Sequence, residues 1–299
     1  MSSEKTESTR DLEDWITREI VAYVSSSEGN RLALLDGSRI YDDPIVGFAC
    51  GEDPIFQTLK EVIGPFHLTP AEAMERVLGA RGIPTIPAER IGVISYVLPI
   101  SKATRRENAK MKDMASRRWA HTRLYGERFN EEVQAHVVSL LGREGYHAVA
   151  PQLERGIFKV FADERVGFAS TWSQRHVAFA AGLGTFGLCD GLITAAGKAH
   201  RIGSVLVDRP LPSPLRTEDI HRDCLFFNGG GCMECATRCP AGAITERGHD
   251  KSRCRDYYEG TSQVVMDLYG VDTYGCGLCQ TGVPCEARAP KRRGERGQS

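Results

Sequence analysis

Cysteine is concentrated at one end of this chain of 299 residues, and that concentration restricts what the chain can fold into more than any other feature. Only Cys50 and Cys189 lie in the first 223 residues. The other eight are Cys224, Cys232, Cys235, Cys239, Cys254, Cys276, Cys279 and Cys285. A small secreted domain would use such a density for disulfides, but the first residues contain neither the apolar segment nor the twin arginine of an export signal. We therefore predict a cytoplasmic chain whose reduced cysteines bind metal.

The spacing of the cysteines indicates iron–sulfur clusters. Residues 232–240 read C-x2-C-x3-C-P, which is the end of the bacterial ferredoxin run C-x2-C-x2-C-x3-C-P. Residues 276–285 repeat the pattern imperfectly, with five residues before the last cysteine. Zinc is the alternative, because CxxC pairs also bind zinc, but the ferredoxin-type run favours two [4Fe-4S] clusters.

A rule from two-cluster ferredoxins divides the eight cysteines: the cysteine before the proline ligates the other cluster. The first cysteine set is then Cys224, Cys232, Cys235 and Cys285. The second cysteine set is Cys239, Cys254, Cys276 and Cys279. The region is rich in glycine and poor in long apolar runs, so we expect cluster binding and folding to be one event. Cys50 and Cys189 are left over, and burial as a small apolar thiol is the expectation for Cys189.

The residues before the cysteine-rich region predict a mixed α/β fold. Apolar residues at helical spacing predict helices over 11–25 and 126–142, and Thr69-Pro70 with Glu72 marks a helix start with a capping box. Strands are predicted over 45–49, 91–98, 147–150, 157–161 and 202–207. The predicted fold class is α+β: a mixed α/β domain over 1–210 for cofactor and substrate, a ferredoxin-like domain with two [4Fe-4S] clusters over 215–290, and a basic flexible tail over 291–299. Prolines at 210, 212 and 214 mark the linker.

Composition excludes several partners. The chain is 41% hydrophobic and 26% charged, which is typical of globular proteins, and it has no apolar run of membrane-spanning length. The net charge of -1 provides no general attraction to nucleic acid or to an anionic membrane. We therefore expect neither a membrane nor a nucleic acid as partner.

A stretch before the cysteines resembles a known family. Residues 180–194 read AAGLGTFGLCDGLIT, and residues 200–214 read HRIGSVLVDRPLPSP. With the cysteine run, this pattern resembles the cobalamin-dependent iron–sulfur reductases, which comprise epoxyqueuosine reductases and reductive dehalogenases. The resemblance is strong over about residues 180–290 and covers the division of ligands given above. It implies a reductive site served by base-off cobalamin. Residues 182–187 also match GxGxxG, but the glycines that follow preclude the helix that a dinucleotide site requires.

The chain departs from epoxyqueuosine reductase at three places. That enzyme has an Asp-x-x-Pro stretch before the glycine-rich turn, where residues 169–172 here contain no carboxylate. Its Gly-Lys-Asn becomes Gly-Leu-Cys at 187–189, and its Asp-Tyr-His becomes Arg-Phe-Asn at 128–130. These differences predict another substrate. A proton donor must then come from other residues, and the candidates are His176 and Tyr125, with His121 as a further one.

Gly182, Gly184 and Gly187 are the predicted cofactor-binding residues, because glycine lets the backbone approach a bulky cofactor closely. The predicted function is an iron–sulfur oxidoreductase that delivers low-potential electrons to a reductive site in the N-terminal domain. Cobalamin is the acceptor that the resemblance implies, and a flavin or the substrate itself are the alternatives. The expected partners are a ferredoxin or flavodoxin-type electron donor and a small-molecule or nucleoside substrate. Two other functions remain open: a ferredoxin-like electron-transfer protein that serves a partner enzyme, and an RNA-modifying reductase, which the missing aspartate disfavours.

Overall fold

A four-stranded antiparallel sheet forms the centre of the molecule. The computed structural model describes residues 2–291, and side chains from residue 11 onward. The strands follow the order β1 (Ile45–Cys50), β2 (Gly92–Pro99), β8 (His200–Val207) and β3 (Ala148–Val149). All residues of β2 are buried, because this central strand is covered on both faces. Ser95 of β2 pairs with Ser204 of β8, which fixes the register.

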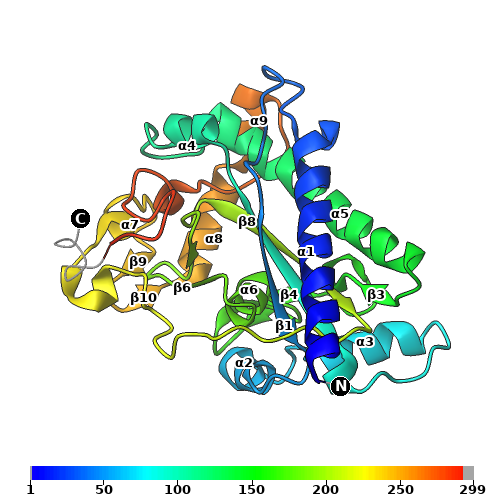
Figure 1. Ribbon diagram of the computed structural model, residues 1–299. Coiled ribbons are helices and arrows are strands. Elements are labelled where there is room, and N and C mark those ends of the chain that lie inside the picture. The colour runs from blue at the N-terminus through cyan, green and yellow to red at the C-terminus, as the bar shows by residue number, and fades with distance from the viewer. Residues whose placement is uncertain (1, 292–299) are drawn as a thin grey trace.

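Helices cover both faces of this sheet and make a three-layered molecule (Figure 1). One face packs against α1 (Ser2–Ser26) and α5 (Arg117–Arg143), which contribute Ile16, Ile20, Phe129 and Val133 to a core with Ile94 and Val205. The other face packs against α2 (Ile55–Ile63), α3 (Pro70–Gly79) and α6 (Gln174–Ala180), with Phe56, Met74 and Val177 on Val93 and Leu206. Alternate residues of β2 and β8 therefore serve opposite cores.

Most of the predicted elements of this part are confirmed. The helix start at Pro70 is confirmed with its capping box, in which the Glu72 amide donates to Thr69 Oγ1 at 3.3 Å and the Thr69 amide donates to Glu72 Oε2 at 2.9 Å. The strands predicted at 45–49, 91–98 and 202–207 correspond to β1, β2 and β8.

Two predicted elements differ from the structure. The helix predicted over 126–142 begins earlier, at Arg117, because Ser116 Oγ caps it by accepting from the Trp119 amide at 3.1 Å. The strand predicted over 157–161 is wrong in position. Residues 157–159 precede β4 (Val160–Asp163), which pairs with β5 (Gly167–Ser170) in a separate hairpin. The bounds of β4 are set by its pairing with β5, and the apolar run 157–161 gives no information about that partner strand.

The cysteine-rich region folds as short elements: α7 (Glu234–Thr237), β9 (Ile244–Thr245), β10 (Gly248–His249), α8 (Lys251–Gly260) and α9 (Ser262–Tyr269). Its small apolar core includes Leu188 and Ile193 from the preceding part of the chain. Val265 of α9 and Val271 belong to the core under α5. The cysteine-rich region therefore shares its packing with the larger part, and a ferredoxin-like domain with its own boundary at 215 stays a prediction.

The linker between the two parts is fixed to the larger one. Arg216 donates to both carboxylate oxygens of Asp53 at 2.7 Å and to the carbonyl of Ala180 at 2.8 Å. The predicted basic tail over 291–299 falls, apart from Lys291, outside the described residues. None of the helices in residues 2–291 is both long and apolar enough to cross a membrane.

Candidate metal centre

The four side chains of the first cysteine set line a single cavity. Cys224 follows the linker, Cys235 lies in α7 with Cys232 just before it, and Cys285 comes from the end of the described chain. Asn228 fixes the turn after Cys224, because its side-chain amide donates to the carbonyls of His221, Arg222 and Cys224. Four thiols from three separate segments thus face one space.

A backbone contact brings Cys285 to this cavity. The amide of Lys198 donates to the Cys285 carbonyl at 2.9 Å, and the amide of Ala199 donates to the Glu286 carbonyl at 3.2 Å. Gly197 has a φ of +82°, and a Cβ at this position would lie 2.3 Å from the carbonyl oxygen of Glu286. Only glycine permits this approach, so the turn before β8 holds the last cysteine in place.

In the second cysteine set, Cys239, Cys254 and Cys276 lie near one another. Cys254 lies in the first turn of α8, behind the cap that Asp250 forms with the Arg253 amide at 2.9 Å. Burial raises the pKa of Cys254 to about 12, and the nearby thiols of Cys276 and Cys239 add to this rise. Among the described residues, no three His, Cys, Asp or Glu side chains converge as they would on a single metal ion. A [4Fe-4S] cluster instead takes one thiolate on each iron.

The loop of the second run packs directly on α5. Gly277 has a φ of +60°, and a Cβ there would lie 2.0 Å from the indole of Trp119. Asn108, which is fully buried, donates to the Cys276 carbonyl at 3.2 Å and to Thr281 Oγ1 at 3.1 Å. Residues 276–281 therefore rest on a platform formed by α5 and the end of α4 (Lys102–Asn108).

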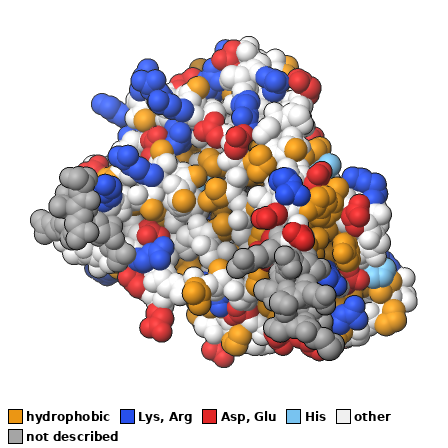
Figure 2. Space-filling model, viewed as in Figure 1, with side chains coloured by type: hydrophobic (Ala, Val, Ile, Leu, Met, Phe, Trp, Pro, Cys, Tyr) orange, Lys and Arg blue, Asp and Glu red, His pale blue; other side chains and the backbone are white. Residues whose placement is uncertain are grey.

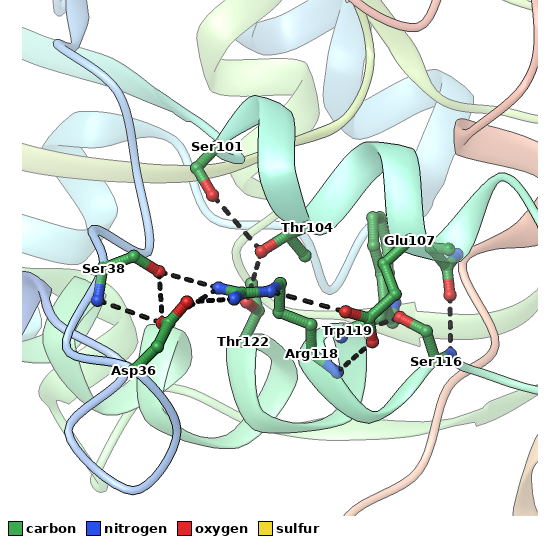
Figure 3. Close-up of polar contacts among 10 residues, drawn as sticks. Asp36, Ser38, Ser101, Thr104, Glu107, Ser116, Arg118, Trp119 and Thr122 are labelled. Carbon is green, nitrogen blue, oxygen red and sulfur yellow. Dashed lines mark hydrogen bonds and ion pairs between the residues drawn. The ribbon is translucent and has the colours of Figure 1, made fainter.

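An ion-pair network stiffens this platform (Figure 3). Arg118 of α5 lies between Asp36 and Glu107, and it donates to Ser38 Oγ at 2.7 Å. The hydrogen bond from Arg118 holds the pKa of Asp36 below its usual range. The loop around Asp36 is thereby fastened to the junction of α4 and α5, which supports the second cysteine run.

Cys189 and Lys198 lie between the two cysteine sets. Cys189 is 5% exposed and packs in the same small apolar core as Cys235 of the first set and Cys279 of the second set. The prediction that Cys189 is buried is confirmed. Lys198 is 3% exposed, lines the same cavity as the first set, and donates from Nζ to Cys189 Sγ at 3.2 Å. A buried ammonium is costly unless an anion compensates it, and a thiolate-ligated cluster is such an anion.

The predicted catalytic residues lie apart. Tyr125 is half-buried on α5, near His121, while His176 lies on α6. These helices cover opposite faces of the sheet, so the structure does not bring Tyr125 and His176 together. Ser173 Oγ lies 2.7 Å from Nδ1 of His176, and burial lowers the pKa of His176 to about 3, with the charge of Arg175 adding to this shift. A role in catalysis stays a prediction for both residues.

The predicted cofactor-binding glycines contact the protein's own chain. A Cβ on Gly184 would lie 2.2 Å from the Ile193 carbonyl, because β6 (Gly184–Phe186) pairs with β7 (Leu192–Thr194). A Cβ on Gly182 would lie 2.8 Å from Pro214 of the linker. The hairpin also explains why no helix follows residues 182–187. Packing within the chain thus accounts for Gly182 and Gly184, and the contact of the glycines with a cofactor stays a prediction.

Sequence reasoning missed three residues of this centre: Lys198, Asn108 and Gly277. A lysine two residues before the apolar strand β8 is a weak signal by itself. Nothing in the local sequence shows that Asn108 contacts a loop far along the chain, or that Gly277 meets an aromatic ring.

Comparison with known proteins supports the resemblance. No protein-family model matches the chain. Epoxyqueuosine reductase from Escherichia coli K12 is 31% identical over 160 residues, which is 52% of this chain and 35% of the relative. The enzyme from Aliivibrio fischeri is 30% identical over 162 residues, covering 50% of this chain and 42% of the relative. The chain is thus similar to the epoxyqueuosine reductases over about half of its length.

The match to epoxyqueuosine reductases is partial. The aligned segment spans well under half of these relatives, 29% in the case of the Bacillus cereus enzyme. Among solved structures, a catabolic reductive dehalogenase in complex with 3-bromo-4-hydroxybenzoic acid superimposes with a TM-score of 0.50 at 13% identity. That superposition covers 92% of this chain and 36% of the dehalogenase, and at this identity it shows the fold alone.

Proposed function

We propose that this protein is an iron–sulfur oxidoreductase of the epoxyqueuosine reductase type that acts on a different substrate. The observation that carries the proposal is the cavity lined by Cys224, Cys232, Cys235 and Cys285. The ferredoxin rule selects these four thiols from eight, and they come from three separate segments.

The residues around the cavity fit an iron–sulfur cluster. Thiolates are the soft ligands that bind such clusters, and the cavity offers four of them. The buried ammonium of Lys198 supplies a positive charge beside a group that would be anionic. The second cysteine set supplies thiols for a second cluster, and the nearby thiols of Cys276 and Cys239 add to the raised pKa of Cys254.

Two clusters, once bound, would supply single-electron transfer at low potential. Cys189 packs in one small core with Cys235 of the first set and Cys279 of the second set. This shared core brings members of the two sets close to each other, which suits electron transfer between them. The apolar residues Leu188, Ile193 and Val283 exclude water from this region.

The reaction itself is the part in which this chain departs from its relatives. Residues 169–172 stand where epoxyqueuosine reductase has Asp-x-x-Pro. Here Trp172 is 1% exposed in the core, and its Nε1 donates to Ser204 Oγ at 2.9 Å. Ala169 stands at the position of the aspartate and has no proton to donate, so we infer another donor, with His176 and Tyr125 as candidates. Cobalamin is the proposed acceptor of electrons, and a nucleoside or another small molecule is the proposed substrate.

A basic edge offers a surface for the electron donor. Figure 2 shows Lys and Arg side chains gathered at the upper left of the molecule, over α4. The exposed cations on and after α4 include Lys102, Arg106, Lys110 and Lys112. Asn108 connects this helix to Cys276 of the second set. We propose that an acidic donor of the ferredoxin or flavodoxin type docks here, because complementary charge steers association.

A second candidate function is electron transfer to a partner enzyme, without a substrate of the protein's own. The packing of the glycine-rich turn favours it. Gly182 and Gly184 lie against Pro214 and Ile193, where the reductase function would require space for a cofactor. Both functions use the same two clusters and differ in whether the chain binds an acceptor.

Anaerobic purification with analysis of iron, sulfide and cobalt tests these functions. We expect about eight irons with matching sulfide per chain, because the cysteines provide two sets of four ligands. Cobalt in equal amount to protein, or a base-off corrinoid spectrum after reconstitution, would support the reductase. Iron and sulfide without binding of a corrinoid or a flavin would favour the electron carrier. Zinc without sulfide would contradict both functions.

A further inference from the structure

Lys198 is a buried cation whose side chain has a sulfur partner. Its side chain lines the cavity of the first cysteine set and donates from Nζ to Cys189 Sγ at 3.2 Å. In the described part of the chain, no Asp or Glu side chain forms an ion pair with Lys198. A charge that is 3% exposed and lacks a carboxylate partner needs another anion close by.

The backbone holds Lys198 in a fixed position. The turn before it is closed in both directions, since the Thr194 amide donates to the Gly197 carbonyl at 3.0 Å and the Gly197 amide donates to the Thr194 carbonyl at 2.9 Å. The Thr194 hydroxyl adds a hydrogen bond to the same Gly197 carbonyl at 2.8 Å. The amide of Lys198 itself is bound to the carbonyl of Cys285, a member of the first set. Lys198 is therefore held directly beside Cys285 by a backbone hydrogen bond.

We propose that Lys198 sets the reduction potential of the cluster held by the first cysteine set, raising it above the value that the same site would have without this charge. The inference rests on the proposed function. Four thiolates outweigh the positive charge of the cluster core, so the ligated cluster is an anion and becomes more negative when it accepts an electron. A fixed positive charge in a buried site stabilises the reduced form more than the oxidised form.

Cys189 has a positioning role in this arrangement. Its sulfur accepts the hydrogen bond from Lys198, and its side chain packs in the same small core as Cys235 and Cys279. It thereby holds the ammonium beside members of both cysteine sets. It is not one of the eight ligands, and its removal should leave the iron content unchanged.

The test is a redox titration of the full chain, purified and reconstituted without oxygen and followed by electron paramagnetic resonance. Lys198→Met removes the charge and keeps an apolar side chain of similar length. We expect one of the two midpoint potentials to fall by about 59 mV, which corresponds to a tenfold shift in the reduction equilibrium of a one-electron couple. Lys198→Arg should retain most of the wild-type potential. Lys159→Met, which removes an exposed lysine just before β4, is the matched control and should leave both potentials unchanged.

The outcomes separate this inference from the proposed function. Unchanged potentials in Lys198→Met, with full iron and sulfide, would overturn the inference and leave the proposed function standing. A wild-type chain that binds no iron and sulfide would overturn both. If Lys198→Met fails to fold, Lys198→Gln keeps a polar group in the cavity, and the same fall in potential is expected. A loss of about half the iron in Cys189→Ala would show that Cys189 is a ligand and overturn its positioning role.

Discussion

At the scale of single residues, His67 shows how burial controls a charge. His67 lies in the loop between α2 and α3, is fully buried, and stacks on Trp172. Its Nε2 accepts from the Ser173 amide at 3.1 Å, which requires an unprotonated nitrogen. Burial lowers the pKa of His67 to about 4, the charge of Lys60 lowers it further, and the charge of Glu72 opposes them. His67 is therefore neutral in the folded protein at neutral pH.

This shift predicts a pH dependence of stability. The unfolded chain protonates His67 near pH 6.5, whereas the folded protein does so only near pH 4, so the unfolded state binds more protons between these values. The contribution of neutral His67 to the free energy of unfolding is therefore fully present above pH 6.5. It decreases as the pH drops toward 4, by about 3 kcal/mol at most. Urea unfolding of wild type and His67→Gln between pH 4 and 7 measures this loss, since glutamine keeps an acceptor but does not titrate. Equally steep curves for the two proteins would refute the prediction.

At the scale of elements, the contact between residues 276–279 and α5 connects the cysteine-rich region to the sheet. Gly277 combines a left-handed backbone with the closest approach of any described glycine to a side chain, 2.0 Å from a built Cβ to Trp119. A methyl group there would push the loop away from α5. Because Cys276 and Cys279 flank this glycine, the second cysteine set depends on the contact.

Gly277→Ala should therefore destabilise the protein by about 2 kcal/mol or more, through overpacking together with a strained backbone. Gly260→Ala is the control, because no atom lies within 4 Å of a Cβ built at this position in α8. The control should be neutral or slightly stabilising. Thermal unfolding under anaerobic conditions compares the two variants, and equal midpoints would contradict the role given to Gly277.

At the scale of the whole molecule, the two cysteine sets connect segments that are far apart in the sequence. The first set includes residues of the linker, α7 and the end of the described chain, while the second set includes the turn after α7, α8 and the loop on α5. In the predicted division, Cys235 of α7 and Cys239 just after it belong to different sets, so the sets are crossed. Binding of the two clusters should thus fasten the cysteine-rich region to the rest of the protein.

Cys239→Ala tests the crossed arrangement. We expect loss of the cluster held with Cys254, Cys276 and Cys279, so that iron falls to about half of the wild-type content. Cys50→Ala, at a half-buried cysteine of β1, should retain all of the iron. Iron analysis and electron paramagnetic resonance of the remaining cluster identify which one is lost. Loss of the cluster held by Cys224, Cys232 and Cys235 would show that the sets are not crossed.

Local patterns predicted the elements that local interactions define. The capping box at Thr69 and the apolar strand β2 are confirmed. The hydrogen bonds of the capping box form between residues three apart, and the burial of β2 follows from its pattern of apolar residues. The strand predicted over 157–161 is displaced from the observed β4, since the bounds of β4 depend on pairing with β5. The early start of α5 depends on Ser116, a cap that the apolar spacing alone does not reveal.

The sequence by itself identified the eight clustered cysteines and predicted their division, because the spacing of residues 232–240 is a short-range property that cluster ligands require. Only the tertiary structure decided that the four thiols of the first set line one cavity, and that Lys198 and Cys189 lie beside them. It also decided that Tyr125 and His176 lie on opposite faces of the sheet. The physical reason is that strand pairing and close backbone approach bring these residues together from distant parts of the chain. No stretch of neighbouring residues contains that information.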